Sequence, residues 1–261
     1  MPSIDDSKCI FITGATSGIG RALAFDLAKL PGRPQVIAAG RREDRLEELS
    51  KAGLHAIPLD LGLDAEALKR AMDNLISHFP NLDTIILNAG IQHEIHFKRE
   101  QVDMSKIIEE VTVNYTSVVA LITYVLPHFL KLSEEGRPSF IITVTSGLGI
   151  VPGPFVPNYS ATKAALRSFS TSLRAQLHDT NVHVMEIIPP LVESELHDAY
   201  GTTERLSKFW MPLDEFTKTT MEGLRRGDNH IPAGQSKVAF EKYEQGKEQT
   251  ALQVQKMREK W

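Results

Sequence analysis

Cysteine is almost absent from the chain. Cys9 is the single cysteine among 261 residues, which excludes an intramolecular disulfide and fits a reducing compartment. Its place in a short apolar run predicts a small buried side chain rather than a reactive thiol. We therefore expect a cytoplasmic protein whose stability depends on an apolar core.

Strong net charge and long apolar runs are also missing. The formal charge of −4 gives no global field that would attract a nucleic-acid backbone or an anionic bilayer. The N-terminus carries acids where a secretion signal carries basic residues, no apolar stretch follows, and no later run predicts a membrane span. We expect neither nucleic acid nor a membrane as a partner.

What the sequence does contain is an alternation of short β-branched runs and longer helical patterns. This order is typical of βαβ units around a parallel sheet, and 42% hydrophobic residues suffice for one sizeable core. We predict a single α/β domain over residues 1–261. The expected strands are Cys9–Thr13, Gln35–Gly40, His55–Pro58, Thr84–Asn88, Phe140–Thr145, Val182–Ile188 and Asn229–Pro232. The expected helices are Ile19–Lys29, Arg42–Lys51, Asp64–Phe79, Asp103–Leu132, Tyr159–Asp179 and Leu213–Arg226.

Two connections are less regular than the others. Residues 146–157 are rich in Gly and Pro, and residues 189–212 are long and mixed. Ligands of open α/β sheets bind beyond the carboxyl ends of the strands, where both loops must lie. We expect them to wall a substrate site and the polar tail 236–261 to form an accessory helix. An apolar or aromatic substrate is favoured by the wall residues Leu148, Ile150, Phe155, Leu196, Tyr200, Phe209, Trp210 and Met211.

A glycine-rich turn joins the first expected strand to the first helix. It reads Thr13-Gly-Ala-Thr-Ser-Gly-Ile-Gly20, with the spacing GxxxGxG and no Lys after the last glycine, which excludes a nucleoside triphosphate P-loop. Its three glycines let backbone N–H groups approach a pyrophosphate at the positive end of the helix. The turn predicts a dinucleotide site.

The second expected strand ends in Gly40-Arg41-Arg42. A carboxylate at this point would accept hydrogen bonds from an adenosine ribose, whereas an arginine accommodates a 2′-phosphate. Gly40 supplies no carboxylate and Arg41 supplies a guanidinium, so the sequence favours NADP(H) over NAD(H). The competing interpretation is that Arg41 and Arg42 are solvated residues at the start of a helix.

Two later segments extend the expected cofactor groove. Asp60, after the third strand, is placed to accept a hydrogen bond from an adenine amino group, although it could equally cap the next turn. Asn88-Ala89-Gly90 ends the fourth strand where the ribose of the cofactor should pass.

Four polar residues mark the reacting end. Tyr159 and Lys163 stand one helical turn apart, where the ammonium should lower the pKa of the phenol from about 10 toward neutrality and make it an acid/base. Ser146 can polarise a substrate carbonyl, and its surroundings are not GxSxG, which disfavours a nucleophile elbow. Asn114, inside an apolar helix, needs a specific partner such as a backbone carbonyl or a water serving Lys163.

Together these motifs resemble the short-chain dehydrogenase/reductase family, over roughly the first 200 residues. The resemblance implies one Rossmann-type domain with a doubly wound, seven-stranded parallel sheet, and a homodimer or homotetramer, since the Tyr159 helix pairs between subunits in many members. It implies Tyr159 as acid/base and Lys163 as the residue that lowers its pKa and binds the nicotinamide ribose. Ser146 would orient the substrate, and Asn114 would hold a proton-relay water. Arginine at position 41 implies NADP(H).

One segment departs from the family pattern. The family has Pro-Gly, then Val and Thr, after the sixth strand, whereas this chain reads Pro189-Pro190-Leu-Val192-Glu-Ser194. Proline at 190 closes a backbone conformation open to glycine, while Ser194 still offers a hydroxyl. The expected cofactor contacts are Gly14, Thr16, Ser17, Gly18, Ile19, Gly20, Arg41, Arg42, Asp60, Leu61, Asn88, Ala89, Gly90, Tyr159, Lys163, Pro189, Val192 and Ser194.

The favoured function is an NADP(H)-dependent oxidoreductase that interconverts a carbonyl (ketone or aldehyde) and an alcohol by hydride transfer, acting as a reductase. An NAD-dependent alcohol dehydrogenase and a non-catalytic dinucleotide sensor or scaffold are the alternatives. We expect no metal, because His93 and His96 do not form an HExxH pair; they are placed to contact the substrate instead.

Overall fold

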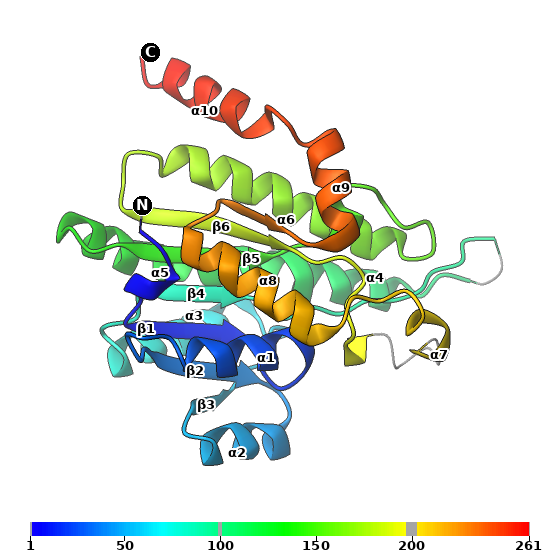
Figure 1. Ribbon diagram of the computed structural model, residues 1–261, viewed down its shortest axis with the longest axis horizontal. Helices are drawn as coiled ribbons and strands as arrows, with labels where there is room; N and C mark the ends of the chain where they lie inside the picture. The colour runs from blue at the N-terminus through cyan, green and yellow to red at the C-terminus, as the bar shows by residue number, and fades with distance from the viewer. Residues whose placement is uncertain (1, 99–100, 197–202, 261) are drawn as a thin grey trace.

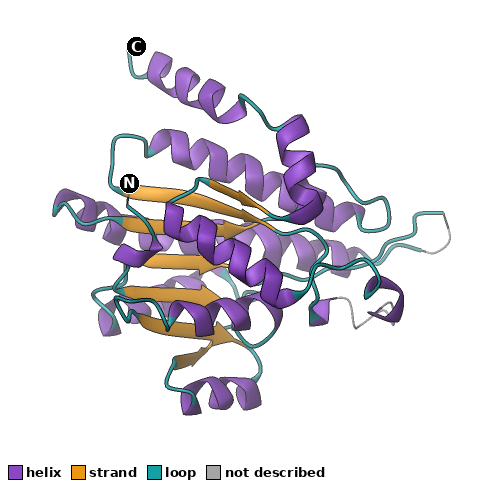
Figure 2. Cartoon of the chain, viewed as in Figure 1, coloured by secondary structure: helices purple, strands orange, loops and turns teal. Residues whose placement is uncertain are grey.

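The chain forms a seven-stranded parallel sheet between two layers of helices (Figure 1, Figure 2). The computed structural model describes residues 2–98, 101–196 and 203–260. The strand order is β3-β2-β1-β4-β5-β6-β7, which confirms the expected doubly wound sheet. The strands are β1 Cys9–Thr13, β2 Gln35–Gly40, β3 His55–Pro58, β4 Thr84–Leu87, β5 Ser139–Val144, β6 Val182–Ile188 and β7 His230–Pro232.

Both faces of the sheet are covered, so β1, β4 and β5 are buried along their whole length. On β1, Ile10 and Ile12 join a core shared with α1, α2 and α8, whereas Cys9 and Phe11 join one shared with α3, α5 and α6. The helices are η1 Ile4–Asp6, α1 Gly18–Leu27, α2 Glu43–Lys51, α3 Ala65–His78, α4 Met104–Val111, η2 Thr112–Thr116, α5 Ser117–Glu134, η3 Gly147–Gly149, α6 Pro157–Gln176, α7 Thr203–Leu206, α8 Leu213–Arg226, α9 Gly234–Tyr243 and α10 Lys247–Arg258.

The sheet reverses its winding at β1, which sets the place of the ligand. β1 pairs with β2 on one side and with β4 on the other. The connections that follow β1 and β4 run to opposite faces of the sheet, and a crevice opens beyond the carboxyl ends of these two strands.

The expected helix Asp103–Leu132 is interrupted. A π-helical turn, Thr112–Thr116, separates α4 from α5. Such turns carry one extra residue and occur at functional sites, and this one contains Asn114. By length and composition the whole run could cross a membrane, but Leu121 and Phe129 are fully buried in the core against the sheet.

The C-terminal tail also differs from the expectation of one helix. It forms α9 and α10, and Gly246 between them has a φ of +80° that favours glycine. α10 lies along α6, and α9 reaches the end of β7 (Figure 1). The expected substrate loop 189–212 contains the short helix α7.

Candidate active site

A pocket of about 1240 Å³ opens at the carboxyl edge of the sheet. Among the described residues that line it are all the expected cofactor contacts except Gly20. Ser146, Tyr159 and Lys163 also line it, whereas Asn114 lies behind the wall. Residues far apart in the sequence therefore converge on one cavity.

The glycine-rich turn lies close beneath Asn88. The Asn88 amide donates to the carbonyls of Thr13 at 3.0 Å and Gly14 at 3.3 Å. A Cβ on Gly20 would lie 2.4 Å from Asn88 Nδ2, so this glycine is required for packing. Gly14 has a φ of +67°, which the turn needs.

The start of α1 fits an anionic group. α1 begins at Gly18, and its N-cap Ser17 makes no side-chain capping bond within the described part of the chain. The first N–H groups of a helix carry a partial positive charge and bind phosphate when they are uncapped. The open turn and its close backbone approach fit the pyrophosphate of a dinucleotide.

The adenosine end of the pocket is built by the residues after β2. Arg42 donates through Nε to Thr16 Oγ1 at 3.3 Å and through Nη2 to Ser17 Oγ. Arg45, which sequence reasoning missed, donates to the Thr16 carbonyl at 3.4 Å. It is the third residue of α2, and only the folded helix shows that its side chain reaches back to the glycine-rich turn. Arg42 thus binds two hydroxyls of the turn, and Arg45 binds its backbone.

Asp60 adopts the structural role that the sequence left open. Its carboxylate accepts from the Gly62 backbone at 2.9 Å, as a turn cap does. Its Oδ1 also lies 3.9 Å from Arg41 Nη1. Its expected contact with an adenine amino group stays a prediction.

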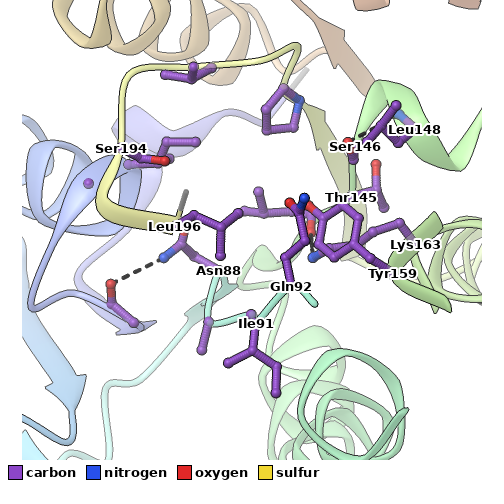
Figure 3. A pocket seen from close by; sticks show the side chains of 18 of the residues that line it. Asn88, Ile91, Gln92, Thr145, Ser146, Leu148, Tyr159, Lys163, Ser194 and Leu196 are labelled. Carbon is purple, nitrogen blue, oxygen red and sulfur yellow. Dashed lines mark hydrogen bonds between the residues drawn. The ribbon is translucent and has the colours of Figure 1, made fainter. Parts of the chain in front are cut away.

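Tyr159, Lys163 and Ser146 gather at the other end of the pocket (Figure 3). The first two come from the opening turns of α6, which starts with Pro157 in the favoured first-turn position. Lys163 Nζ donates to the Val144 carbonyl at 2.9 Å and lies 5.6 Å from the centre of the Tyr159 ring. Ser146 Oγ accepts from the Leu148 backbone at 3.1 Å.

The expectation of a near-neutral tyrosine pKa is wrong for the free protein. Burial raises the pKa of Tyr159 to about 12, a hydrogen bond with Ser146 opposes this, and the charge of Glu110 adds to it. Burial also lowers the pKa of Lys163 to about 8. The lysine binds the Val144 carbonyl, and removal from water is the largest influence on the phenol.

Asn114 holds the loop that follows β4. It is fully buried. Its Nδ2 donates to the Ile91 carbonyl at 2.8 Å and to Thr162 Oγ1 at 3.2 Å, and its Oδ1 accepts from the Ile91 N–H at 2.9 Å. The expected backbone-carbonyl partner is present, and the proton-relay water stays a prediction. The π-helical turn positions the amide for these bonds.

Glu110 is a second residue that sequence reasoning missed. Its side chain is fully buried, accepts from Asn158 Nδ2 at 2.6 Å and also accepts from the His93 backbone N–H. It therefore ties the wall loop to the residue that precedes Tyr159. The sequence signal that could have identified Glu110 is an acidic residue on the same helical run as Asn114.

Ser236 is a third missed residue, and it comes from the supposedly accessory tail. It is buried, and its Oγ donates to the Pro189 carbonyl at 2.8 Å. A Cβ on Gly147 would lie 2.2 Å from this oxygen. Nothing in the polar composition of the tail indicates that α9 closes the pocket.

The proline that departs from the family pattern is matched by α9. Pro190 lines the pocket, and a Cβ on Gly234 would lie 3.3 Å from its ring. Gly234 has a φ of +47°, which places the backbone of α9 against the proline. The unusual residue at 190 therefore packs where the tail begins.

The substrate end of the pocket is mainly apolar. Leu148, Phe155 and Leu196 line it as expected (Leu148 and Leu196 are labelled in Figure 3), whereas Tyr200 lies outside the described residues. The other expected wall residues that are described, Ile150, Phe209, Trp210 and Met211, do not line it; Ile91, Val151, Pro152, Leu191 and Leu206 do.

The two loop histidines differ in position. His96 lines the pocket, near Glu94 Oε2 at 3.8 Å, and His93 Nε2 lies 3.3 Å from Glu109 Oε2. Within the described ranges, no group of three His, Cys, Asp or Glu side chains is arranged to hold a metal ion.

Comparison with known proteins agrees with this geometry. The family model for short chain dehydrogenases matches residues 8–205. The chain is 35% identical to the uncharacterized oxidoreductase DltE of Bacillus subtilis over 227 residues, which are 86% of this chain and 87% of that protein. It is 32% identical to an NADP-dependent 3-hydroxy acid dehydrogenase of Schizosaccharomyces pombe, over 87% of this chain and 91% of the other.

A solved structure shows the same fold. A short-chain dehydrogenase of Sphingobium yanoikuyae in complex with NADPH superposes with a TM-score of 0.74 at 23% identity, covering 86% of this chain and 87% of the other. The motifs, the strand order and the family match lead to one assignment: this chain belongs to the short-chain dehydrogenase/reductase family of NAD(P)-dependent oxidoreductases.

Proposed function

We propose that the protein reduces a ketone or an aldehyde to an alcohol, with NADPH supplying the hydride from C4 of its nicotinamide. One observation carries the proposal. A single pocket is lined at one end by the arginines that follow β2 and at the other by Ser146, Tyr159 and Lys163. The first end has the charges to hold a phosphorylated adenosine, and the second has the groups to polarise and protonate a carbonyl oxygen.

The residues of the reacting end have separate tasks. Ser146 and Tyr159 line the same end of the pocket, so a substrate oxygen there can accept from both hydroxyls. A Tyr159 pKa of about 12 keeps the phenol protonated at neutral pH, which is the state that a reductase needs in its acid. Lys163, with a pKa of about 8, is mostly charged at neutral pH and stabilises the phenolate that remains.

The choice of NADP(H) rests on the adenosine end. A side chain at position 40 would place its Cβ 2.5 Å from Thr16 Cγ2, so the carboxylate of an NAD-type site has no room there. Arg42 and Arg45 stand beside the same threonine and can bind a phosphate through several N–H groups. The NADP-dependent relative from Schizosaccharomyces pombe supports this choice.

The substrate class follows from the walls. Leu148, Phe155 and Leu196 offer apolar surface, and Glu94 and His96 add polar groups at the same cavity. An apolar or aromatic carbonyl compound fits these surfaces, and a partly polar one can reach the Glu94 and His96 side.

A reductase screen with one variant tests the proposal. NADPH oxidation is followed over ketones, aldehydes, quinones and steroids, and NADPH and NADH affinities are measured by fluorescence. Tyr159→Phe should lower turnover by about 10² to 10⁴-fold because it removes the acid, with NADPH affinity nearly unchanged. Tyr243→Phe, at an exposed tyrosine of α9, is the control.

The outcomes separate the alternatives. Undiminished turnover in Tyr159→Phe contradicts the mechanism. Tight NADPH binding without turnover on any compound favours the sensor or scaffold, and equal affinity for NADH and NADPH contradicts the choice of cofactor and supports the NAD-dependent alternative.

A further inference from the structure

A carboxylate from the substrate loop binds the two arginines of the adenosine end. Arg42 Nη1 lies 2.5 Å from Glu195 Oε2, and Arg45 Nη1 lies 2.7 Å from Glu195 Oε1. Each carboxylate oxygen thus meets a different guanidinium. Glu195 follows Ser194 on the segment after β6, so this contact joins the two sides of the pocket.

The contact lies at the end of the pocket that the proposed function assigns to the 2′-phosphate of NADP(H). Arg42 also donates to the hydroxyls of Thr16 and Ser17 in the glycine-rich turn. Thr16, Ser17, Arg42 and Glu195 all line the pocket. The carboxylate therefore occupies a site whose other members are two guanidinium groups and two hydroxyls, which is the chemistry that binds a phosphate monoester.

We propose that Glu195 is a specificity-determining residue that competes with the 2′-phosphate of NADP(H) for Arg42 and Arg45. The inference rests on the proposed function, because it assumes that the 2′-phosphate binds at this end. A phosphate monoester carries up to two negative charges and takes up the same N–H donors. The 2′-phosphate must either displace the Glu195 carboxylate or bind beside it against like-charge repulsion. Both routes lower the affinity of the protein for NADP(H).

Displacement of Glu195 from the two arginines would affect the substrate side of the pocket. Val192 pairs with Met211 in a short bridge, and the chain then continues through Ser194 to Glu195 and Leu196. Ser194 and Leu196 line the pocket (Figure 3). When the 2′-phosphate binds the arginines, this wall loses its ion pairs with Arg42 and Arg45, whereas NAD(H) leaves both pairs in place.

Glu195→Gln tests the inference, and Glu193→Gln is the matched control. Glu193 lies on the same exposed segment, has the same charge, and accepts from the Leu213 backbone at 3.4 Å. The probes are adenosine 2′,5′-bisphosphate and adenosine 5′-monophosphate, which differ by the 2′-phosphate alone. Their affinities are measured by calorimetry at one fixed salt concentration, with thermal unfolding of each variant as a check of folding.

We expect Glu195→Gln to bind the bisphosphate about three- to tenfold more tightly than the wild type, as the loss of two exposed ion pairs allows. Monophosphate affinity should not change, and Glu193→Gln should behave as the wild type. Equal gains in both variants indicate a general charge effect and overturn the inference. Unchanged or weaker bisphosphate binding by Glu195→Gln overturns it too, the weaker case meaning that Glu195 orients the arginines for phosphate.

The proposed function fails in a different way. If the wild type and both variants bind the bisphosphate no more tightly than the monophosphate, the NADP(H) assignment falls and the inference falls with it. If the wild type prefers the bisphosphate and only the Glu195→Gln gain is missing, the assignment stands and the inference alone is refuted.

Discussion

The Thr145 hydroxyl donates a 2.6 Å hydrogen bond to Glu186 Oε1. Thr145 precedes Ser146, and Glu186 is fully buried in β6. Arg167 Nη1 donates to the same oxygen at 2.9 Å, and His230 Nδ1 lies 2.9 Å from the other. The backbone that carries Ser146 is thus joined to a buried set of charged groups.

The stability of the protein should depend on pH through His230, a member of this buried group of charged side chains. Burial favours neutral His230, but bonds to Glu186 and to Glu248 of α10 outweigh it and raise its pKa above the ordinary 6.5. A raised folded pKa stabilises the protein fully below the unfolded pKa and less as pH rises through the folded value. We therefore expect the free energy of unfolding in urea to fall as pH rises above 6.5. His230→Gln should flatten this dependence, and an unchanged slope would contradict the assignment.

Ser236→Ala should loosen the closure by α9. The variant removes the bond to the Pro189 carbonyl, which still accepts from the Gly147 N–H at 2.9 Å. We expect a loss of about 1 kcal/mol of unfolding free energy and a higher KM for substrate, measured by urea unfolding and steady-state kinetics. Ser172→Ala on α6, at an exposed serine that bonds its own helix, should change both quantities less. Equal effects of the two variants would argue against a role for α9 in the site.

Glu110→Gln should alter the pH profile of reduction. The negative charge of Glu110 adds to the raised pKa of Tyr159, so its removal should let the phenol lose its proton at lower pH. We expect the alkaline fall in kcat/KM to move to lower pH. Gln keeps one acceptor for Asn158 or the His93 N–H, which limits structural loss. Glu109→Gln, on the same helix but half exposed, is the control, and coincident profiles for all three proteins would count against this coupling.

Gly40→Asp alone should fail to switch the cofactor. The new Cβ would meet Thr16 Cγ2 at 2.5 Å, and overpacking of this kind costs about 1 to 3 kcal/mol. Adding Thr16→Ala removes that methyl group and should recover most of the loss in melting temperature. The double variant should then prefer NADH over NADPH in fluorescence titrations. A stable single variant that already prefers NADH would show that the threonine does not restrict position 40.

The positions of the strands along the chain and those of Tyr159 and Lys163 could be predicted because they depend on local patterns. Continuous apolar runs indicate strands that are buried on both faces, and a spacing of four places two side chains on one helix face. The π-helical turn could not be predicted, because the Asn114 side chain in it bonds the backbone of Ile91, which lies in the loop after β4.

Tertiary burial explains the other differences. The pKa of Tyr159 is set by the loss of water around α6, which no residue spacing records. Arg45 reaches the glycine-rich turn only because the folded α2 directs its side chain to the Thr16 carbonyl. The single domain, the cytoplasmic location, the homodimer or homotetramer and the absence of nucleic-acid and membrane partners stay predictions.

Closure of the pocket by Ser236 has a consequence for protein synthesis. The glycine-rich turn and Tyr159 are translated before Ser236, whose side chain bonds the Pro189 carbonyl. A nascent polypeptide that has left the ribosome only as far as β6 carries the reacting groups without the wall that α9 supplies. The site can close only after β7 and α9 have also been translated.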